Sequence, residues 1–403
     1  MMERRFFTES LLQDHPKEKM LFLAGPRQVG KTTLAQTVLN QMIGLYLNYD
    51  IQSHRKKIRE GFDLLADLRV QSNFPMIVFD EIHKLNKFKS YLKGFYDENR
   101  GSARIWVTGS GRLDLYQKGG DSLLGRYFLY HIHPFTISDL QETQTVSLSE
   151  FLEKILKDPV KSKKSQYYQD LLEFGGFPEP FLKKDKAFYH RWIKTRKQRL
   201  IQEDIRDLTR IQDLNRLEQL VDILSSRVGS PLSINSLRED IGVAFETIDS
   251  WIQALEKVYY IYTIAPYSKK ITRAIRKEKK LYFWDWSEIK DPGIRFENFI
   301  VSHWKKTIDY WNDFGISSAE MHYIRDKEKR EIDLVISINK KPELLIEIKS
   351  SDLQPSPHLF RFGDAIGCKN FLQIVNIPDT HRIVKVSGRS VVVASPDIVF
   401  GIL

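Results

Sequence analysis

Cysteine and long apolar runs are the scarcest features of this sequence. Cys368 is the one cysteine among 403 residues, so an internal disulfide is excluded and we expect a lone buried thiol in a reducing compartment. No apolar run approaches the roughly 18 residues that span a bilayer, and the first residues lack the apolar core and cleavage site of a signal peptide. We therefore expect a cytoplasmic protein with no membrane partner.

Acidic residues are outnumbered by basic ones, 52 against 62, which gives a formal net charge of +10. This balance favours a polyanionic partner without identifying it. Basic residues gather at 161–164, 191–199 and 269–280, although each cluster taken alone is also typical of a solvated face. With 42% hydrophobic and 28% charged residues, the chain has the composition of a globular protein with two or three domains.

An apolar run at 21–24 is followed by a segment that matches the pattern GxxxxGK[ST]. A strand, a glycine turn and a helix start in this order hold the phosphates of a nucleoside triphosphate, whereas a chance match would be only a glycine turn. We expect Lys31 to reach the β- and γ-phosphates of ATP and Thr32 to coordinate Mg²⁺. The predicted nucleotide-binding residues are Gly25, Pro26, Arg27, Gln28, Val29, Gly30, Lys31, Thr32 and Thr33.

A second apolar strand, 76–79, ends in two acids, Asp80 and Glu81. This pattern is typical of a Walker B strand, in which Asp80 holds the magnesium ion and Glu81 polarises the attacking water. The alternative is a buried strand followed by a solvated acidic helix cap.

Two further residues are candidates for the same site. Ser110, with Thr108 as the alternative, follows a third strand where AAA+-type cores place a sensor of the bound nucleotide; an ordinary turn is the competing interpretation. Arg126 precedes another apolar stretch and is an arginine-finger candidate, which would stabilise charge on a neighbouring subunit's nucleotide. A surface salt bridge explains Arg126 equally well.

The motifs at 25–34, 79–84, 107–110 and 124–126, with Gly-Gly-Phe-Pro-Glu at 175–179, resemble those of a known family. They are similar to the prokaryotic AAA-type (AAA_14) P-loop ATPases that carry a C-terminal DUF4143 domain. The resemblance runs nearly end to end and implies an α/β protein of three parts: an AAA+-type core with a parallel sheet, a helical and winged-helix-like middle, and a PD-(D/E)XK restriction-endonuclease-like domain. The expected boundaries are 1–140 for the core, 141–225 for a helical lid, 226–290 for the winged helix and 291–403 for the nuclease-like domain.

The middle of the chain has the pattern of a helix-turn-helix followed by two strands and a basic wing. Helices are expected at 236–242 and 245–258, strands at 259–266 and 280–285, and the wing at 269–280. This arrangement would expose Glu246, Thr247 and Ser250 on the second helix and suits either DNA or a protein partner. A lid arginine that senses nucleotide is also expected, and the spacing does not choose among Arg196, Arg199 and Arg206.

The last third contains an Asp followed by Glu-x-Lys on two predicted strands, 330–336 and 343–349. In restriction-endonuclease-like folds such strands bring Asp333 and Glu347 together around Mg²⁺ or Mn²⁺. Glu347 and Lys349 share a strand face, so Lys349 would help to activate water. Glu297, on a helix upstream, is the expected third metal ligand, and Glu331 is a weaker candidate. The alternative is a scaffold whose acids merely bind a cation or pair with neighbouring lysines.

Two hypotheses follow. The first is an oligomeric ATPase that binds DNA and cleaves it with Asp333, Glu347 and Lys349. The second is a nucleotide-switched DNA- or protein-binding module whose nuclease fold is inactive.

Overall fold

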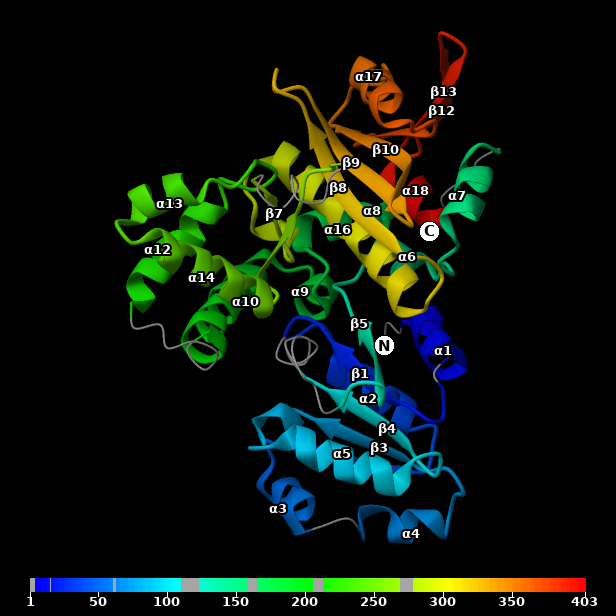
Figure 1. Cartoon of the computed structure of the whole chain (residues 1–403), viewed down its shortest axis with the longest axis vertical. Helices are drawn as coiled ribbons and strands as arrows, with labels where there is room; N and C mark the ends of the chain where they lie inside the picture. Colours follow the sequence, from blue (N-terminus) through cyan, green and yellow to red (C-terminus); the bar gives the residue numbers. More distant parts are fainter. Residues whose placement is uncertain are drawn as a thin grey trace. The chain divides into compact units, whose positions relative to one another are not determined.

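The computed structural model describes residues 4–14, 16–60, 63–109, 123–157, 165–205, 213–268 and 278–403, and the chain divides into two compact units. The first unit is Met1–His133 and the second is Pro134–Leu403. Figure 1 shows both along the chain. Within the described ranges no helix is both long enough and apolar enough to cross a bilayer.

The first unit is built on a parallel five-stranded sheet in the order β2-β3-β4-β1-β5. Its strands are β1 (Met20–Ala24), β2 (Gly44–Asn48), β3 (Met76–Asp80), β4 (Arg104–Thr108) and β5 (Tyr127–His131). The three strands predicted around the nucleotide motifs are therefore confirmed. The register aligns Asn48, Asp80 and Thr108 across three neighbouring strands, so their side chains meet at one edge of the sheet.

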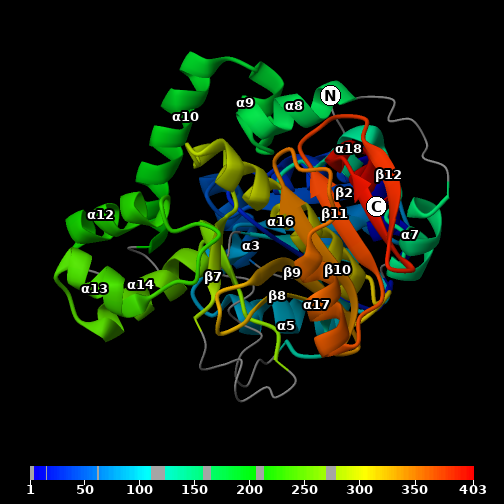
Figure 2. The same cartoon turned by 90° about the horizontal axis from the view of Figure 1, so that it is seen from above.

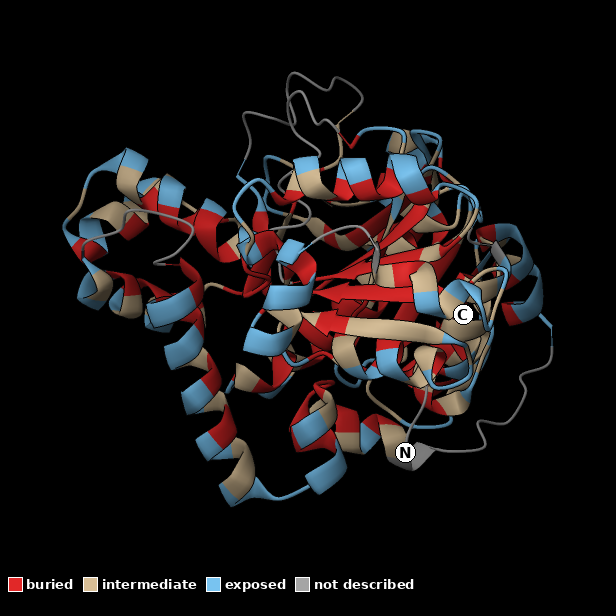
Figure 3. Ribbon diagram, turned by 90° about the horizontal axis from the view of Figure 1, so that it is seen from below, coloured by how far each residue is buried: buried red, intermediate tan, exposed pale blue. Residues whose placement is uncertain are grey.

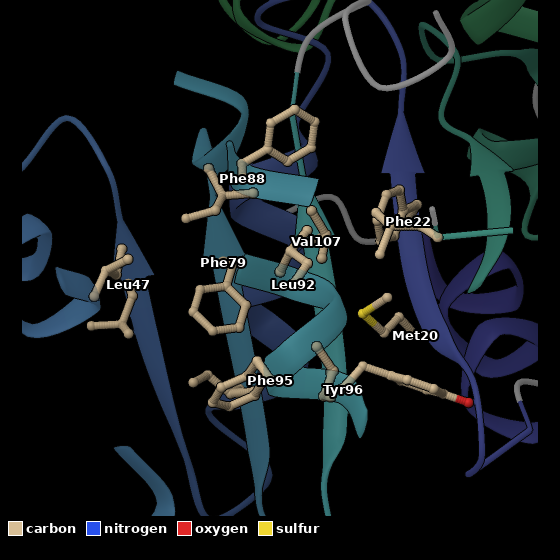
Figure 4. Packing of buried hydrophobic residues seen from close by; sticks show 14 of the residues in the cluster. Met20, Phe22, Leu47, Phe79, Phe88, Leu92, Phe95, Tyr96 and Val107 are labelled. Carbon is tan, nitrogen blue, oxygen red and sulfur yellow. The ribbon is translucent and has the colours of Figure 1, made fainter. Parts of the chain in front are cut away.

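Helices and short turns connect these strands. They are α1 (Arg5–Asp14), α2 (Lys31–Leu39), α3 (Gln52–Glu60), η1 (Asp63–Leu65), α4 (Ala66–Arg69), η2 (Ile82–Lys84) and α5 (Phe88–Asn99). In Figure 4, Leu92 and Phe95 of α5 lie over Phe79 of β3, and the rings of Phe79 and Phe95 meet edge to face with centroids 5.1 Å apart. Each such side chain, when fully buried, contributes roughly 1.5–3 kcal/mol, and this packing fixes the end of β3 that carries Asp80.

The second unit begins with helices that precede a small antiparallel sheet of β6 (Ile261–Ile264) and β7 (Lys280–Phe283). The helices α12, α13 and α14 lie next to one another in chain order, as Figure 2 shows. Ile248, Trp251 and Leu255 form the buried face of α14, as their spacing predicts. The helical elements are α6 (Ile137–Gln141), α7 (Leu148–Ile155), α8 (Ser165–Phe174), α9 (Pro178–Lys183), α10 (Lys186–Arg199), η4 (Leu200–Ile205), α12 (Leu214–Leu224), α13 (Ile234–Ile241), α14 (Phe245–Lys257) and η5 (Trp286–Glu288).

The rest of the second unit is a six-stranded mixed sheet in the order β12-β13-β11-β10-β9-β8. The helix α16 packs on β8 and β10, and α17 packs on β9 and β10. The buried residues, red in Figure 3, lie mainly on the inner strands β9, β10, β11 and β13, whereas the edge strands β8 and β12 are partly exposed. Cys368 lies in the core under α17, which confirms a buried thiol. The elements are α16 (Pro292–Asp313), β8 (Ala319–Arg325), β9 (Glu331–Ile338), β10 (Lys341–Lys349), α17 (Pro357–Ile366), β11 (Phe371–Val375), β12 (His381–Val386), β13 (Arg389–Ala394) and α18 (Pro396–Ile402).

Two expectations differ from the structure. The first unit ends at His133, and α6 belongs to the second, where Ile137 N–H donates to His303 Nε2 (3.0 Å) and Lys306 pairs with Asp139 (2.8 Å). Lys280 is not part of an exposed wing: it is 1% exposed, because β7 carries it into the interior of the second unit. The remaining wing residues, 269–277, lie outside the described residues, and the fourfold domain division stays a prediction.

Candidate functional site

The loop between β1 and α2 needs glycine at two positions. Gly25 has a φ of 149°, and a Cβ there would lie 2.3 Å from the backbone oxygen of Ile132 on the segment after β5. Gly30 has a φ of 98° immediately before α2 begins at Lys31. Residues that carry a Cβ rarely adopt these backbone φ values. The two glycines therefore set the curve of the loop and the direction in which its N–H groups point.

Lys31 lies inside this curve. Its side chain is 7% exposed, and Nζ donates to the backbone oxygens of Gly25 (2.8 Å) and Pro26 (2.6 Å). Of the other predicted loop residues, Pro26 and Val29 are buried, Arg27 and Gly30 are partly buried, and Gln28 and Thr33 are exposed. The ammonium group is thereby held where the loop turns toward the helix.

Asp80 is 2% exposed and is surrounded by neutral hydrogen-bond donors. Its Oδ2 accepts from the hydroxyls of Thr32 (2.8 Å) and Tyr46 (2.6 Å), and its Oδ1 accepts from Thr108 (2.5 Å). Burial, followed by the hydrogen bond to Asp80, raises the pKa of Tyr46, so that hydroxyl stays a donor. Asp80 makes no ion pair within the described part of the chain, and its negative charge is left for a cation to balance.

Mg²⁺ fits this arrangement. Hydroxyl and carboxylate oxygens are its preferred protein ligands, and those of Thr32 and Asp80 lie side by side. Sequence reasoning found both residues and the alternative Thr108, while Ser110 lies outside the described residues. The sequence analysis did not identify Tyr46 as a neighbour of Asp80. The one indication in the sequence was that Tyr46 lies two residues before Asn48, on the same face of the strand.

Glu81 adopts a left-handed backbone with a φ of 54°. Its Oε2 lies 3.4 Å from Lys84 Nζ and 3.5 Å from His83 Nε2, and Lys84 also pairs with Asp50 (2.6 Å). Its backbone N–H donates to the oxygen of Thr108 (3.1 Å), which ties it to the same edge of the sheet. The carboxylate of Glu81 therefore lies beside Asp80 in the chain but is engaged by Lys84.

Arg126 forms an ion pair with Asp97 of α5 at 2.9 Å. This is the surface salt bridge that the sequence left open for it. The role as an arginine finger stays a prediction.

In the second unit, β9 and β10 bring Asp333 and Glu347 close together, as the pattern predicts. The Ile348 N–H donates to Asp333 Oδ2 (2.7 Å), and Lys349 Nζ pairs with Glu347 Oε1 (2.7 Å). Glu347 is 3% exposed, and burial, followed by the charge of Asp333, raises the pKa of its carboxyl to about 7. Its other oxygen, Oε2, has no hydrogen-bond partner in the described part of the protein.

Glu297 and Glu331 have a different neighbour, Lys280 of β7. Lys280 Nζ lies 3.5 Å from Glu297 Oε1 and contacts Glu331 Oε1, while Tyr282 donates to Glu297 Oε1 (2.8 Å). Burial acts to lower the pKa of Lys280, but the charges of Glu297, Asp333 and Glu331 outweigh it and the net change is upward. Burial, with a contribution from Asp333, raises the pKa of Glu297 to about 7, although Lys280 acts to lower it.

The predicted metal set of Glu297, Asp333 and Glu347 does not fit a metal ion as a group. Among the described residues there is no group of three or more His, Cys, Asp or Glu side chains arranged to hold one. The physical reason is that a lysine from outside the predicted motif pairs with Glu297. Neither the Asp nor the Glu-x-Lys signal could have revealed that lysine.

The surfaces predicted for nucleic acid differ in charge. Arg191, Lys194 and Arg199 are exposed on α10 at helical spacing and make no ion pair among the described residues. On α14, Glu246 and Ser250 are exposed and Thr247 is partly exposed, so this helix presents a carboxylate. A wing at 269–277 and the cluster at 161–164 lie outside the described residues.

Of the three arginines considered for a lid sensor, Arg196 is buried in the second unit. It pairs with Glu288 (3.4 Å) and lies 4.0 Å from the ring centre of Phe177, next to the glycine turn at 175–176. Arg199 is exposed on α10, and Arg206 lies outside the described residues. The contacts of Arg196 give it a structural role in this unit.

Two families match parts of the chain. Residues 17–141 match a family described as AAA domain, and residues 165–287 match a domain of unknown function, DUF8612. The resemblance implied a DUF4143 domain in the second unit, and that assignment stays a prediction.

Similar curated proteins are uncharacterized. MJ1637 of Methanocaldococcus jannaschii is 22% identical over 296 residues, which cover 67% of this chain and 61% of that protein, so the match spans about three fifths of the relative. Rv2008c of Mycobacterium tuberculosis is 20% identical over 355 residues, covering 85% of this chain and 73% of that protein.

Solved structures resemble the chain weakly. The Walker-type ATPase PABY2304 of Pyrococcus abyssi is 17% identical and has a TM-score of 0.44, covering 73% of this chain and 95% of that one. PCH-2 of C. elegans is 16% identical with a TM-score of 0.23 and covers 34% of this chain and 38% of that one. These scores are too low to support an argument about function.

The AAA-family match covers the glycine loop, Asp80 and the five strands of the first unit. The first unit is thus an AAA-type P-loop ATPase domain on an α/β fold, and the family match runs beyond it through α6 to residue 141. ATP with Mg²⁺ is what such a domain takes.

Proposed function

We propose that the first unit hydrolyses ATP with Mg²⁺ and that its nucleotide state controls DNA binding by the second unit. The observation that carries the ATPase part is Asp80, a buried carboxylate held by neutral donors beside Thr32 at the end of β3. A negative charge fixed in this way attracts a cation.

The roles of the residues follow from their chemistry. Mg²⁺, held by Thr32 and Asp80, would neutralise charge on the phosphate oxygens. Lys31 exchanges its bonds to the Gly25 and Pro26 carbonyls for bonds to the phosphates. Glu81 accepts the proton of the attacking water, and to do so it must turn away from Lys84.

The test separates binding from hydrolysis. Lys31→Ala should abolish ATP-dependent thermal stabilisation, whereas Glu81→Gln should keep it and lose hydrolysis by about 10²–10³-fold. Lys93→Ala, an exposed lysine on α5, is the matched control and should behave like the wild type. Stabilisation by ATP in Lys31→Ala would refute the assignment of the phosphate site.

The DNA part is supported by the basic face of α10 and the net charge of +10. Phosphate contacts supply most of the affinity of sequence-independent binding, and each lost contact lowers the slope of log affinity against log salt by about 0.9. Replacing Arg191, Lys194 and Arg199 with Ala should therefore weaken DNA binding and flatten its salt dependence by roughly 2–3. The control is a double variant in which Lys184 and Lys186 are replaced with Ala. These two lysines already pair with Asp170 and Glu173. Equal salt slopes in the two variants would exclude this face of α10 as the DNA-binding surface.

Control by nucleotide is the remaining part of the proposal. The affinity for DNA should differ between ATP and ADP in the wild type and become indifferent to nucleotide in Lys31→Ala. Equal affinities in the wild type would leave an ATPase and a DNA-binding unit that act separately.

For the second unit we propose a nuclease-like fold that binds DNA without cleaving it. The order α16, β8–β9–β10, α17, β11 and the closeness of Asp333 and Glu347 support the fold and would suit cleavage. The pairing of Glu297 and Glu331 with Lys280 opposes cleavage. Supercoiled DNA with Mg²⁺ or Mn²⁺ should stay intact, with and without ATP; nicking that Asp333→Ala abolishes would establish a nuclease instead.

Assembly into a homo-oligomer, with Arg126 acting across subunits, completes the proposal. ATP hydrolysis per chain should then rise with protein concentration, and Arg126→Ala should remove the rise without preventing ATP binding. A rate per chain that is independent of concentration over the range in which assembly is measured would contradict it.

A further inference from the structure

Lys280 is a buried lysine that lies among the acids predicted to bind a metal. It comes from β7, within the segment matched by DUF8612, whereas Glu297 and Glu331 come from α16 and β9 beyond that segment. Its ammonium contacts both carboxylates directly. A single cation therefore bridges two elements of the candidate nuclease fold.

The backbone fixes Lys280 in this position. It pairs with Ile264 of β6 across the small sheet and forms a further bridge with Pro231. The ring of Tyr323 on β8 lies 5.4 Å from Nζ, and the hydroxyl of Tyr323 donates to the backbone oxygen of Glu278 (2.6 Å). The side chain is thus enclosed by β7, β8, β9 and α16, and cannot move into solvent without opening this packing.

A divalent ion and this ammonium group compete for the same oxygens. Mg²⁺ requires near-octahedral oxygen ligands at about 2.0–2.1 Å, and two of the nearby carboxylates already face Lys280. Asp333 accepts a backbone N–H with one oxygen, and Glu347 pairs with Lys349. The second oxygen of Asp333 and the unpaired Oε2 of Glu347 remain. These two oxygens lack the further carboxylates, those of Glu297 and Glu331, that the ammonium group already engages.

We propose that Lys280 is the resident cation of this acidic cluster and takes the position between Glu297 and Glu331 that a divalent metal would otherwise need. The second unit consequently neither requires nor binds a metal ion at these acids. This inference extends the proposed binding without cleavage and is independent of ATP hydrolysis, which is measured separately.

Mn²⁺ binding, followed by electron paramagnetic resonance of the full chain without nucleotide, tests the proposal. An Asp80→Asn background removes the site in the first unit. In this parent protein, no Mn²⁺ should bind with a Kd below about 1 mM, the weak end of protein carboxylate sites. One bound Mn²⁺ per chain that is lost in Asp333→Ala or Glu347→Ala would overturn the proposal.

Lys280→Met, made in the same background, removes the cation and keeps a side chain of similar length. It should gain one Mn²⁺ site at least tenfold tighter than the parent, and Mn²⁺ should raise its melting temperature by roughly 5 °C. Lys279→Met, the exposed neighbour, should gain neither. A Lys280→Met protein that folds and still binds no Mn²⁺ would refute the competition.

The role of the Lys280 ion pair can be tested even if Lys280→Met folds poorly. If Lys280→Met loses stability because carboxylates are left unpaired, then adding Glu331→Gln should restore most of the lost melting temperature. Glu328→Gln, which pairs with Arg330 at the surface, is the matched control and should restore none. Failure of Glu331→Gln to restore stability would show that the ion pair is not what Lys280 provides.

Discussion

The two units each hold a buried acidic centre, but the groups that surround the acids differ. Asp80 of the first unit accepts from the hydroxyls of Thr32, Tyr46 and Thr108. In the second unit, Glu331 contacts the Lys280 ammonium and Glu347 contacts that of Lys349. Neutral donors orient a carboxylate and leave its charge uncompensated, whereas ammonium groups remove the need for another cation.

This contrast separates a candidate cation-binding site from an internal ion-pair network. Both centres contain buried acids at strand ends, so acid content and burial do not distinguish them. The charge of the partner does. A buried carboxylate without an ionic partner is expensive in an apolar interior, which favours binding of a cation by the first unit.

Removing the carboxylate of the first centre should have the largest effect. Asp80→Ala should lower ATP hydrolysis by about 10²–10³-fold, because it removes the fixed negative charge beside Thr32. A steady-state phosphate-release assay over a range of Mg²⁺ concentrations measures this. Asp67→Ala, in the short helix α4, is the control and should retain full activity. Wild-type rates in Asp80→Ala would place the magnesium site elsewhere.

The second centre should respond to pH. The folded-state pKa of Glu347 is raised from 4.5 to about 7, so the native state holds a proton that the unfolded state has released between these values. The stabilisation by this proton is therefore full below about pH 4.5 and is lost as pH rises through 7, by about 1.4 kcal/mol for each pH unit.

Urea unfolding followed by tryptophan fluorescence from pH 5 to 7 measures this loss. All tryptophans except Trp106 lie in the second unit, so the signal reports mainly on it. Glu347→Gln, which cannot ionise, should reduce the slope but not abolish it, because the pKa values of Glu297 and Glu288 are also raised to about 7. Glu343→Gln on the same strand should leave the slope unchanged. Parallel profiles for the wild type and Glu347→Gln would show that Glu347 ionises normally.

A smaller effect is expected at the neutral donors of Asp80. Thr108→Val keeps the shape of the side chain but removes the donor to Oδ1, and the net contribution of such a bond is about 1 kcal/mol. We expect hydrolysis to fall roughly five- to tenfold at constant ATP affinity. Thr37→Val, on α2 away from Asp80, should leave both unchanged. A loss as large as that of Asp80→Ala would mean that Thr108 does more than orient the carboxylate.

The smallest effect should come from Lys349. Its side chain is 40% exposed and the ammonium group keeps part of its hydration, although its partner Glu347 is buried, so Lys349→Met should lower the free energy of unfolding by only about 1 kcal/mol. Lys280→Met, at a buried position between two carboxylates, should cost clearly more. Equal losses in the two variants would erase the distinction between a half-exposed ammonium group and a buried one.

Much of the fold could be predicted from the pattern of apolar runs and glycines. The strands ending at Ala24, Asp80 and Thr108, the buried face of α14 and the pairing of β9 with β10 were all expected. Periodicity and turn chemistry are local properties, so they are visible in a single sequence. The contacts of α6 with His303 and Lys306 were not foreseen, because they depend on a helix that follows far along the chain.

The phosphate loop could be identified from the amino-acid order alone, because glycines, lysine and threonine stand close together and their chemistry is set by local backbone geometry. The same order also determined that Asp333 and Glu347 would meet, because a hairpin joins them. Which hydroxyl donors and which cations face the acids depends instead on how distant segments pack. Tyr46 reaches Asp80 across a parallel sheet, and Lys280 reaches Glu297 and Glu331 from another sheet, so both depend on long-range packing that no local pattern encodes.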